Sequence, residues 1–177
     1  RDMANRSTAQ RADRSEREDL IQLVGFMLGD EVFGVDILMV QEIIRSAPIT
    51  AVPNAPEFVE GVINLRGDII PVIDLRKRLN LFLGGAKREK NWILILTIEG
   101  RVTGFLVDRG PEGLTVDEAS IEPAPEIVVA GLESQYIRGV CDIGGNKLLI
   151  MLNFANVLLV DEIKRLCLSL SLIDALK

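Results

Sequence analysis

Histidine is absent from this chain of 177 residues, and its absence removes several kinds of active site. Ser–His–Asp and Cys–His catalysis both need an imidazole group, and so does His-ligated zinc. The common general base near neutral pH is missing as well.

Aromatic residues are also scarce, at 5%, and the 20 Lys and Arg residues are outnumbered by 26 Asp and Glu residues, which gives a net charge of −6. Proteins that bind nucleic acid need a basic stripe, and those that bind single strands add stacking aromatics. The composition therefore predicts no nucleic-acid partner. A β-barrel that binds nucleic acid stays open as an alternative, and a basic, aromatic-lined face would support it.

Cysteine is limited to Cys141 and Cys167, which lie far apart and form no CxxC motif. This pattern predicts neither a disulfide scaffold nor a zinc site, and it favours the reducing cytoplasm. Apolar runs stay below the roughly 18 residues of a spanning helix, and the polar start of the chain is unlike a signal peptide. We expect no cofactor, no metal and no direct membrane insertion.

The hydrophobic content of 48% is enough for a packed core. At roughly 150 residues per domain, the length predicts one ordinary domain or two small ones. Residues 1–19 are polar and charged, so we expect a disordered tail there. The ordered domain should span residues 20–163, with a boundary between two subdomains in the Gly-rich segment near 84–91 and a helical extension over 164–177.

Strand patterns dominate the ordered part. Apolar runs on both sides of short turns predict two hairpins in the first half. Their strands should cover residues 22–28, 32–35, 61–65 and 69–73.

Helical patterns are few and short. Asp36 is placed to cap a helix whose apolar positions recur at helical spacing, and Asp74 is placed to cap a helical turn ending near Leu83. Asn153 can cap a helix toward the end of the chain. The apolar positions of the first helix are Ile37, Leu38, Val40, Ile43 and Ile44.

The second half of the chain repeats the first. GVINLRGDIIPVIDL (61–75) aligns with GVCDIGGNKLLIMLNF (139–154) with one insertion, and the turn over 28–34 aligns with that over 98–104. This duplication predicts an all-β protein of two small barrels, each half forming one of them. Closure into barrels would also remove exposed sheet edges.

Catalytic motifs are missing: the chain has no GxSxG, HExxH, P-loop or GxGxxG sequence. Asp36, Asp74 and Asp108 each follow an apolar strand, and converging carboxylates can perform acid–base chemistry or bind a cation. For Asp36 and Asp74, capping is the favoured interpretation. A carboxylate-dependent hydrolase stays an alternative, which requires two carboxylates in one pocket with a raised pKa.

Two positions could serve recognition instead of packing. Arg66 lies at the tip of a predicted hairpin, where it is either a solvated turn residue or a recognition arginine. Val40 and Ile44 lie on the first predicted helix, where they either pack in the core or line a groove for a partner helix.

Several stretches resemble one family. GDEVFGVDILMVQEII (29–44) resembles the opening of the CheW family, the coupling proteins of bacterial chemotaxis, and VPNAPEFVEGVINLRGDIIPVIDLRKRL (52–79) resembles its most characteristic stretch. The similarity extends from about residue 20 to residue 163. Further similar runs are GRVTGFLVD (100–108), IEPAPEIV (121–128) and YIRGVCDIGGNKLLIMLNFANVL (136–158).

The resemblance implies two five-stranded β-barrels packed together and an adaptor without catalysis. Such adaptors link the cytoplasmic tip of methyl-accepting chemoreceptors to the regulatory domain of the histidine kinase CheA, a domain of the same fold. They are cytoplasmic and are recruited to receptor arrays at the membrane. The same module in a type IV pilus or surface-sensing kinase pathway is the alternative.

The resemblance also implies a receptor-binding set. Val40 and Glu42 match positions implicated in receptor contact, and Gly61 and Arg66 match positions at which changes disturb receptor coupling or kinase control. Asn64 belongs to the same motif. Arg66 and Glu42 carry opposite charges and could pair.

Contacts with the kinase are expected at turns at the barrel ends. Gly145 and Asn146 are the candidates for this role.

Overall fold

The computed structural model describes residues 19–45, 47–81, 92–124 and 132–157. The predicted tail up to residue 18, the whole predicted boundary at 84–91 and the predicted extension over 164–177 lie outside these residues. Leu83, the expected end of the second helix, lies outside them too.

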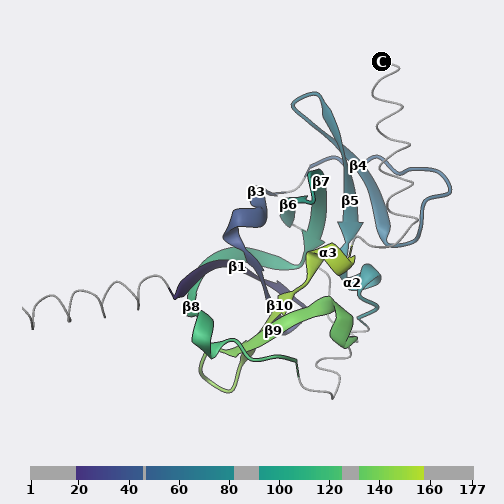
Figure 1. Ribbon diagram of the computed structural model, residues 1–177. Coiled ribbons are helices and arrows are strands. Elements are labelled where there is room, and N and C mark those ends of the chain that lie inside the picture. The colour runs from purple at the N-terminus through teal and green to yellow at the C-terminus, as the bar shows by residue number, and fades with distance from the viewer. Residues whose placement is uncertain (1–18, 46, 82–91, 125–131, 158–177) are drawn as a thin grey trace, which may run out of the picture.

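Within the described residues, ten strands form two five-stranded sheets (Figure 1). Sheet A has the order β8-β1-β2-β10-β9, and sheet B has the order β3-β6-β7-β5-β4. The strands of sheet A are β1 (Leu20–Leu28), β2 (Glu31–Asp36), β8 (Arg109–Asp117), β9 (Ile137–Asp142) and β10 (Leu148–Leu152). Those of sheet B are β3 (Val40–Arg45), β4 (Val59–Leu65), β5 (Asp68–Asp74), β6 (Trp92–Ile98) and β7 (Arg101–Val107).

Each sheet closes on itself through the segment that follows one of its edge strands. Thr50, beyond β3, exchanges two backbone hydrogen bonds of 2.9 and 2.8 Å with Val62 of β4. Glu122, beyond β8, does the same with Val140 of β9, at 2.8 Å in both directions. The prediction of two small five-stranded barrels is therefore confirmed, and we call them barrel A and barrel B.

The Gly-Val pair of the sequence repeat lies at these two closures. Gly61 has a φ of +150°, and a Cβ atom there would lie 2.1 Å from the carbonyl oxygen of Thr50. At Gly139 a Cβ atom would lie 2.6 Å from Cγ2 of Ile121. Both glycines let the closing segment approach the edge strand closely, so the repeated motif has the same structural task twice.

The barrels do not correspond to the two halves of the sequence. Barrel A combines β1 and β2 with β8 to β10, and barrel B combines β3 to β5 with β6 and β7. The halves are joined by parallel pairing of β2 with β10 and of β5 with β7, and by antiparallel pairing of β1 with β8 and of β3 with β6. The expectation that each half forms its own barrel was wrong: a boundary near 84–91 separates the sequence repeats, but it does not separate the barrels.

The prediction of a helix after Asp36 was also wrong. A 3₁₀ turn, η1 (Ile37–Met39), is followed directly by strand β3, which pairs antiparallel with β6. Asp36 does act as the cap, because its Oδ1 accepts a hydrogen bond of 2.9 Å from the backbone N–H of Leu38. Along β3 half-buried and exposed residues alternate, which is the period of a strand.

Short helices occupy the ends of strands. Helix α2 (Leu75–Arg78) is capped by Asp74, which accepts from the N–H groups of Arg76 and Lys77, so this predicted cap is confirmed. Helix α3 (Phe154–Val157) lies at the start of the predicted C-terminal helix, the rest of which lies outside the described residues. Asn153 Oδ1 accepts from the N–H of Asn156 at 3.4 Å. The turns η2 (Glu118–Ser120) and η4 (Ser134–Tyr136) precede the closing segment and β9.

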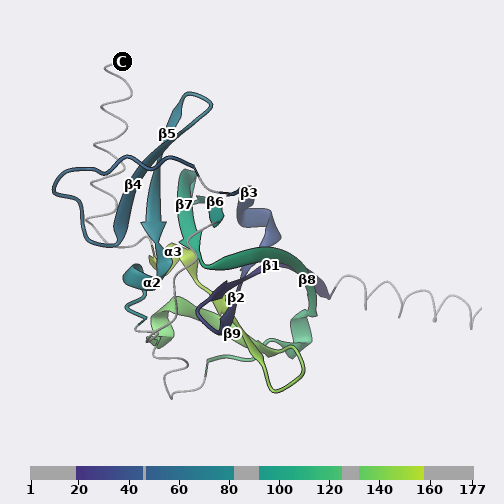
Figure 2. The same ribbon diagram turned by 180° about the vertical axis from the view of Figure 1, so that it is seen from behind.

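Three apolar clusters hold the molecule together. One lies inside barrel B around Ile95, and one lies inside barrel A around Leu149. The largest cluster contains Phe26 and Phe33 of barrel A together with Leu94 and Phe105 of barrel B. This shared cluster packs the barrels against each other, with barrel B above barrel A in Figures 1 and 2.

Candidate docking surfaces

The predicted receptor-binding residues all belong to barrel B. Val40 and Glu42 lie on strand β3, Gly61 and Asn64 lie on β4, and Arg66 lies in the β4–β5 turn. Sequence reasoning placed the first two on a helix, but the strand still brings Glu42 next to the turn.

Arg66 and Glu42 form a two-pronged ion pair. Nη1 of Arg66 donates to Oε1 of Glu42 at 3.1 Å, and Nη2 donates to Oε2 at 2.6 Å. The hydrogen bond from Arg66 lowers the pKa of Glu42, and the same bond raises the pKa of Arg66. The pair suggested by the sequence is therefore present, and it ties β3 to the β4–β5 hairpin.

The backbone of the turn fixes where Arg66 stands. Arg66 and Gly67 have φ values of +52° and +92°, as the tight turns of hairpins require. Asn64 Oδ1 accepts a hydrogen bond of 2.8 Å from the N–H of Gly67. Asn64 thus holds the turn that presents Arg66, which is a role that the hairpin pattern alone did not reveal.

Gly61 stands apart from the other four residues because it is buried. The carbonyl of Thr50 covers the position where its side chain would be. Gly61 therefore shapes β4 and the barrel closure and offers no side chain to a partner.

Apolar side chains are exposed close by in the chain. Leu38 of η1 is 89% exposed, and Ile37 and Ile43 are exposed as well. Val40, by contrast, is half-buried and packs against the shared cluster. Sequence reasoning missed the exposure of Leu38, because helical spacing assigned it to the apolar face of a helix.

The predicted kinase-binding residues lie on barrel A. Gly145 and Asn146 form the exposed turn between β9 and β10, with φ values of +63° and +59°. Asp142 Oδ1 accepts a hydrogen bond of 2.8 Å from the N–H of Gly144 and supports this turn. The β4–β5 and β9–β10 turns project at opposite ends of the molecule (Figure 1), so the structure keeps the two candidate sets apart.

The strand-end carboxylates have structural partners. Asp36 and Asp74 are caps, and Asp108 Oδ2 forms a buried ion pair with Nη1 of Arg76 at 3.0 Å. Sequence reasoning did not foresee this last pair. In the described part of the chain, no three His, Cys, Asp or Glu residues are grouped so that they could hold a metal ion. No helix in that part has the length and apolarity needed to cross a membrane.

Known proteins resemble this chain over most of its length. The family model of the CheW-like domain matches residues 22–162. A chemotaxis protein CheW of Treponema pallidum is 33% identical over 152 residues, which cover 80% of this chain and 85% of the relative. The chemotaxis protein CheW of Klebsiella aerogenes is 37% identical over 137 residues, or 77% and 81% of the two chains.

A solved structure extends the likeness to the fold. The crystal structure of the scaffolding protein TtCheW from Thermoanaerobacter tengcongensis is similar with a TM-score of 0.71 and 36% identity, over 80% of this chain and 90% of that chain. Two joined barrels and these matches define a non-catalytic scaffold of chemotaxis signalling. The chain belongs to the CheW family of chemotaxis proteins.

Proposed function

We propose that this chain binds the cytoplasmic tip of methyl-accepting chemoreceptors with barrel B and the regulatory domain of CheA with barrel A. The observation that carries the proposal is the Glu42–Arg66 pair. An ion pair this exposed adds little to folding stability. Its two-pronged geometry on a stiff turn is better suited to recognition, because charges at the rim of an interface set specificity and association rate.

The receptor face comprises Val40, Glu42, Asn64 and Arg66, and Gly61 supports it from beneath. The exposed Leu38 and Ile43 add apolar area on η1 and β3, as the core of an interface requires.

The kinase face is the β9–β10 turn with Gly145 and Asn146. The protein works in the cytoplasm and is recruited to receptor arrays at the membrane. It brings no chemistry of its own, so receptor control of the kinase has to arise from contacts that differ between the active and inactive arrangements.

A three-component assay tests the proposal. The purified protein should bind a receptor cytoplasmic fragment and the kinase separately, and kinase autophosphorylation should rise only when all three are mixed. Binding to neither partner would refute the proposal.

Two surface variants test the assignment of the faces. Arg66→Glu should lose receptor binding and keep kinase binding, whereas Asn146→Arg should do the opposite. If Arg66→Glu loses kinase binding and retains the receptor, the two faces have been assigned to the wrong barrels.

A further inference from the structure

The joint between the barrels determines how the two proposed docking surfaces are held. Glu42 and Arg66 lie on barrel B, and Asn146 lies on barrel A. The shared apolar cluster joins the barrels, but apolar burial has no preferred direction. Their mutual orientation therefore depends on directional contacts, and α2 and α3 lie where the barrels meet (Figures 1 and 2).

Arg76 of α2 makes the first of these contacts. Its Nη1 lies 3.0 Å from Oδ2 of Asp108, and both side chains are nearly buried. The same Oδ2 accepts a hydrogen bond of 2.7 Å from the N–H of Gly29, in the β1–β2 turn of barrel A. Asp108 also donates its own N–H to the carbonyl of Met27 at 3.1 Å. Arg76, which directly follows barrel B, is thereby linked to barrel A.

Arg78 makes the second contact, on the other side of α2. Its Nε donates to the carbonyl of Val157 in α3 at 3.1 Å, and its Nη1 donates to the hydroxyl of Tyr136 at 3.2 Å. Its guanidinium carbon also lies 5.1 Å from the ring centre of Tyr136 and 5.4 Å from that of Phe58. Phe58 directly precedes β4 of barrel B, whereas Tyr136 and Val157 flank β9 and β10 of barrel A.

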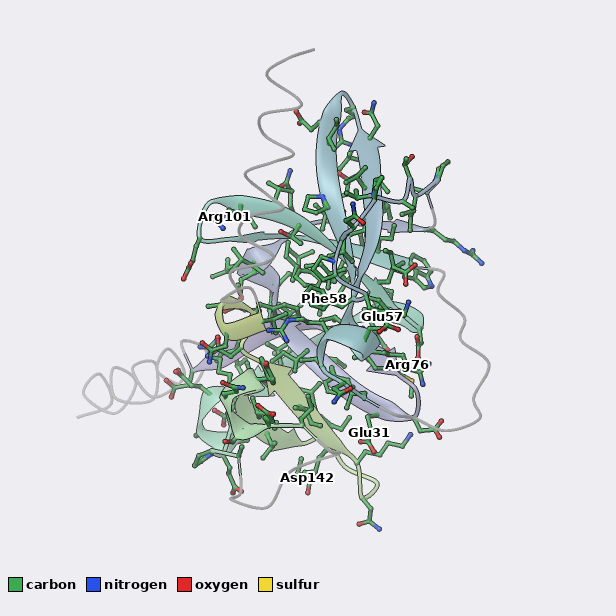
Figure 3. The ribbon with its side chains drawn as sticks, turned by 90° about the vertical axis from the view of Figure 1, so that its right-hand side faces the viewer. Glu31, Glu57, Phe58, Arg76, Arg101 and Asp142 are labelled. Carbon is green, nitrogen blue, oxygen red and sulfur yellow. The ribbon has the colours of Figure 1, made fainter. Side chains whose placement is uncertain are left out.

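The chemistry of arginine suits this position. A guanidinium is planar and carries five donors, so it can stack on rings and donate in its plane at once. Figure 3 shows Phe58 and Arg76 at the level where the two barrels meet. Within barrel B, Asp74 donates its N–H to the carbonyl of Phe58 at 2.8 Å, which links the residue before β4 to the end of β5, where α2 begins.

Lys77, between the two arginines, contacts its own barrel instead. Its Nζ lies 3.0 Å from Oε1 of Glu60 on β4. One short helix therefore carries two charged residues that reach barrel A and one that stays with barrel B. Lys77 supplies a matched control for either arginine.

We infer that α2 is the joint that fixes barrel A against barrel B, and that Arg78 is the positioning residue that lets receptor contacts on barrel B control the kinase held by barrel A. The identity of the partners rests on the proposed function, whereas the joint itself rests on the contacts of Arg76 and Arg78. Without the side chain of Arg78, the barrels should adopt a wider range of relative orientations, while both docking surfaces stay unchanged.

The orientation can be measured by electron–electron distance spectroscopy. Nitroxide amino acids at Arg101 of barrel B and Lys147 of barrel A, both exposed, should give a narrow distance distribution in the otherwise unchanged chain. Arg78→Met should broaden it, Arg78→Lys should broaden it less, and Lys77→Met should leave it narrow. A distance distribution that stays narrow in Arg78→Met, or that broadens equally in Lys77→Met, would refute the inference that Arg78 fixes the orientation of the barrels. If the circular dichroism signal shows that Arg78→Met does not fold, the distance distribution of Arg78→Lys is compared with that of Lys77→Met instead, and equal widths would refute the inference.

Kinase control gives the second readout. Arg78→Met should bind the receptor fragment and the kinase separately as the unchanged chain does, while activation in the three-component assay falls at least about fivefold. Unchanged activation with a broadened distribution would overturn the role in coupling. If the unchanged chain fails to activate the kinase, the proposed function fails, and the distance comparison still decides the joint.

Discussion

Arg66 stands at positive φ in a turn whose backbone bonds do not involve its side chain. Replacing it by alanine therefore leaves the turn as it is and removes the pair with Glu42. We expect Arg66→Ala to weaken receptor binding while the melting temperature hardly changes, because the pair is exposed. Thermal melts monitored by circular dichroism, together with receptor binding curves, check this. A large drop in melting temperature would make Arg66 a structural residue.

The exchanged pair Glu42→Arg with Arg66→Glu separates two roles of these charges. If the pair serves to fix β3 against the hairpin, the double variant restores receptor binding that each single variant loses. If Arg66 instead contacts the receptor directly, the double variant binds as poorly as Arg66→Glu does.

The pH dependence of the pair follows from the lowered pKa of Glu42. A carboxyl group whose pKa is lower in the folded protein stabilises it above the ordinary carboxyl range, and the contribution is lost as the pH falls through the lowered value. We expect the Glu42 carboxyl carbon to titrate at lower pH in the unchanged protein than in Arg66→Gln, as followed by NMR. Equal titration curves would mean that the pair does not form in solution.

Gly61 offers the sharpest stability prediction. Gly61→Ala should destabilise the fold by roughly 3–5 kcal/mol, because backbone strain of about 1–3 kcal/mol adds to two closing hydrogen bonds worth about 1 kcal/mol each. Gly100→Ala is the matched control, since Gly100 has a φ of +77° and open space around it. It should lose only about 1–2 kcal/mol. Urea denaturation measures both, and equal losses would show that the approach of Thr50 is not what Gly61 permits.

At the scale of elements, hairpins and caps could be predicted because their signals are local. The turn at Gly67 and the caps Asp36 and Asp74 depend on neighbouring residues only, and the structure confirms them. Strand β3 could not be predicted, because the apolar residues between Ile37 and Ile44 also fit a helical period. Its partner β6 lies about 50 residues further along the chain, and pairing with β6 makes this segment a strand instead of a helix.

The candidate docking residues show the same division. The Arg66–Glu42 pair could be suggested from charge and from the family resemblance, whereas the buried state of Gly61 became visible only with the closing segment at Thr50. The ion pair of Arg76 with Asp108 was missed because its partners come from different elements and the barrels meet there. Contacts that depend on how two barrels pack leave no pattern in the sequence.

At the scale of the whole molecule, the exchange of strands ties the barrels into one folding unit. Each barrel contains strands from both halves of the chain, and the largest apolar cluster contains residues of both. Unfolding of one barrel would expose the other barrel's part of this cluster to water. The connections are also short, because β2 leads directly through η1 into β3 and β7 leads into β8. A chain built in this way should unfold in a single step.

Two core substitutions test this cooperativity. Leu149→Ala in the interior of barrel A and Ile95→Ala in the interior of barrel B should each cost about 2–5 kcal/mol, because both side chains are fully buried. Each variant should lower one common melting transition, with calorimetric and van't Hoff enthalpies in agreement. Amide protons of β4 and of β9 should lose protection together in both variants. Two separate transitions, each moved by only one of the substitutions, would mean that the barrels unfold independently, and α2 would then join two units that are stable on their own.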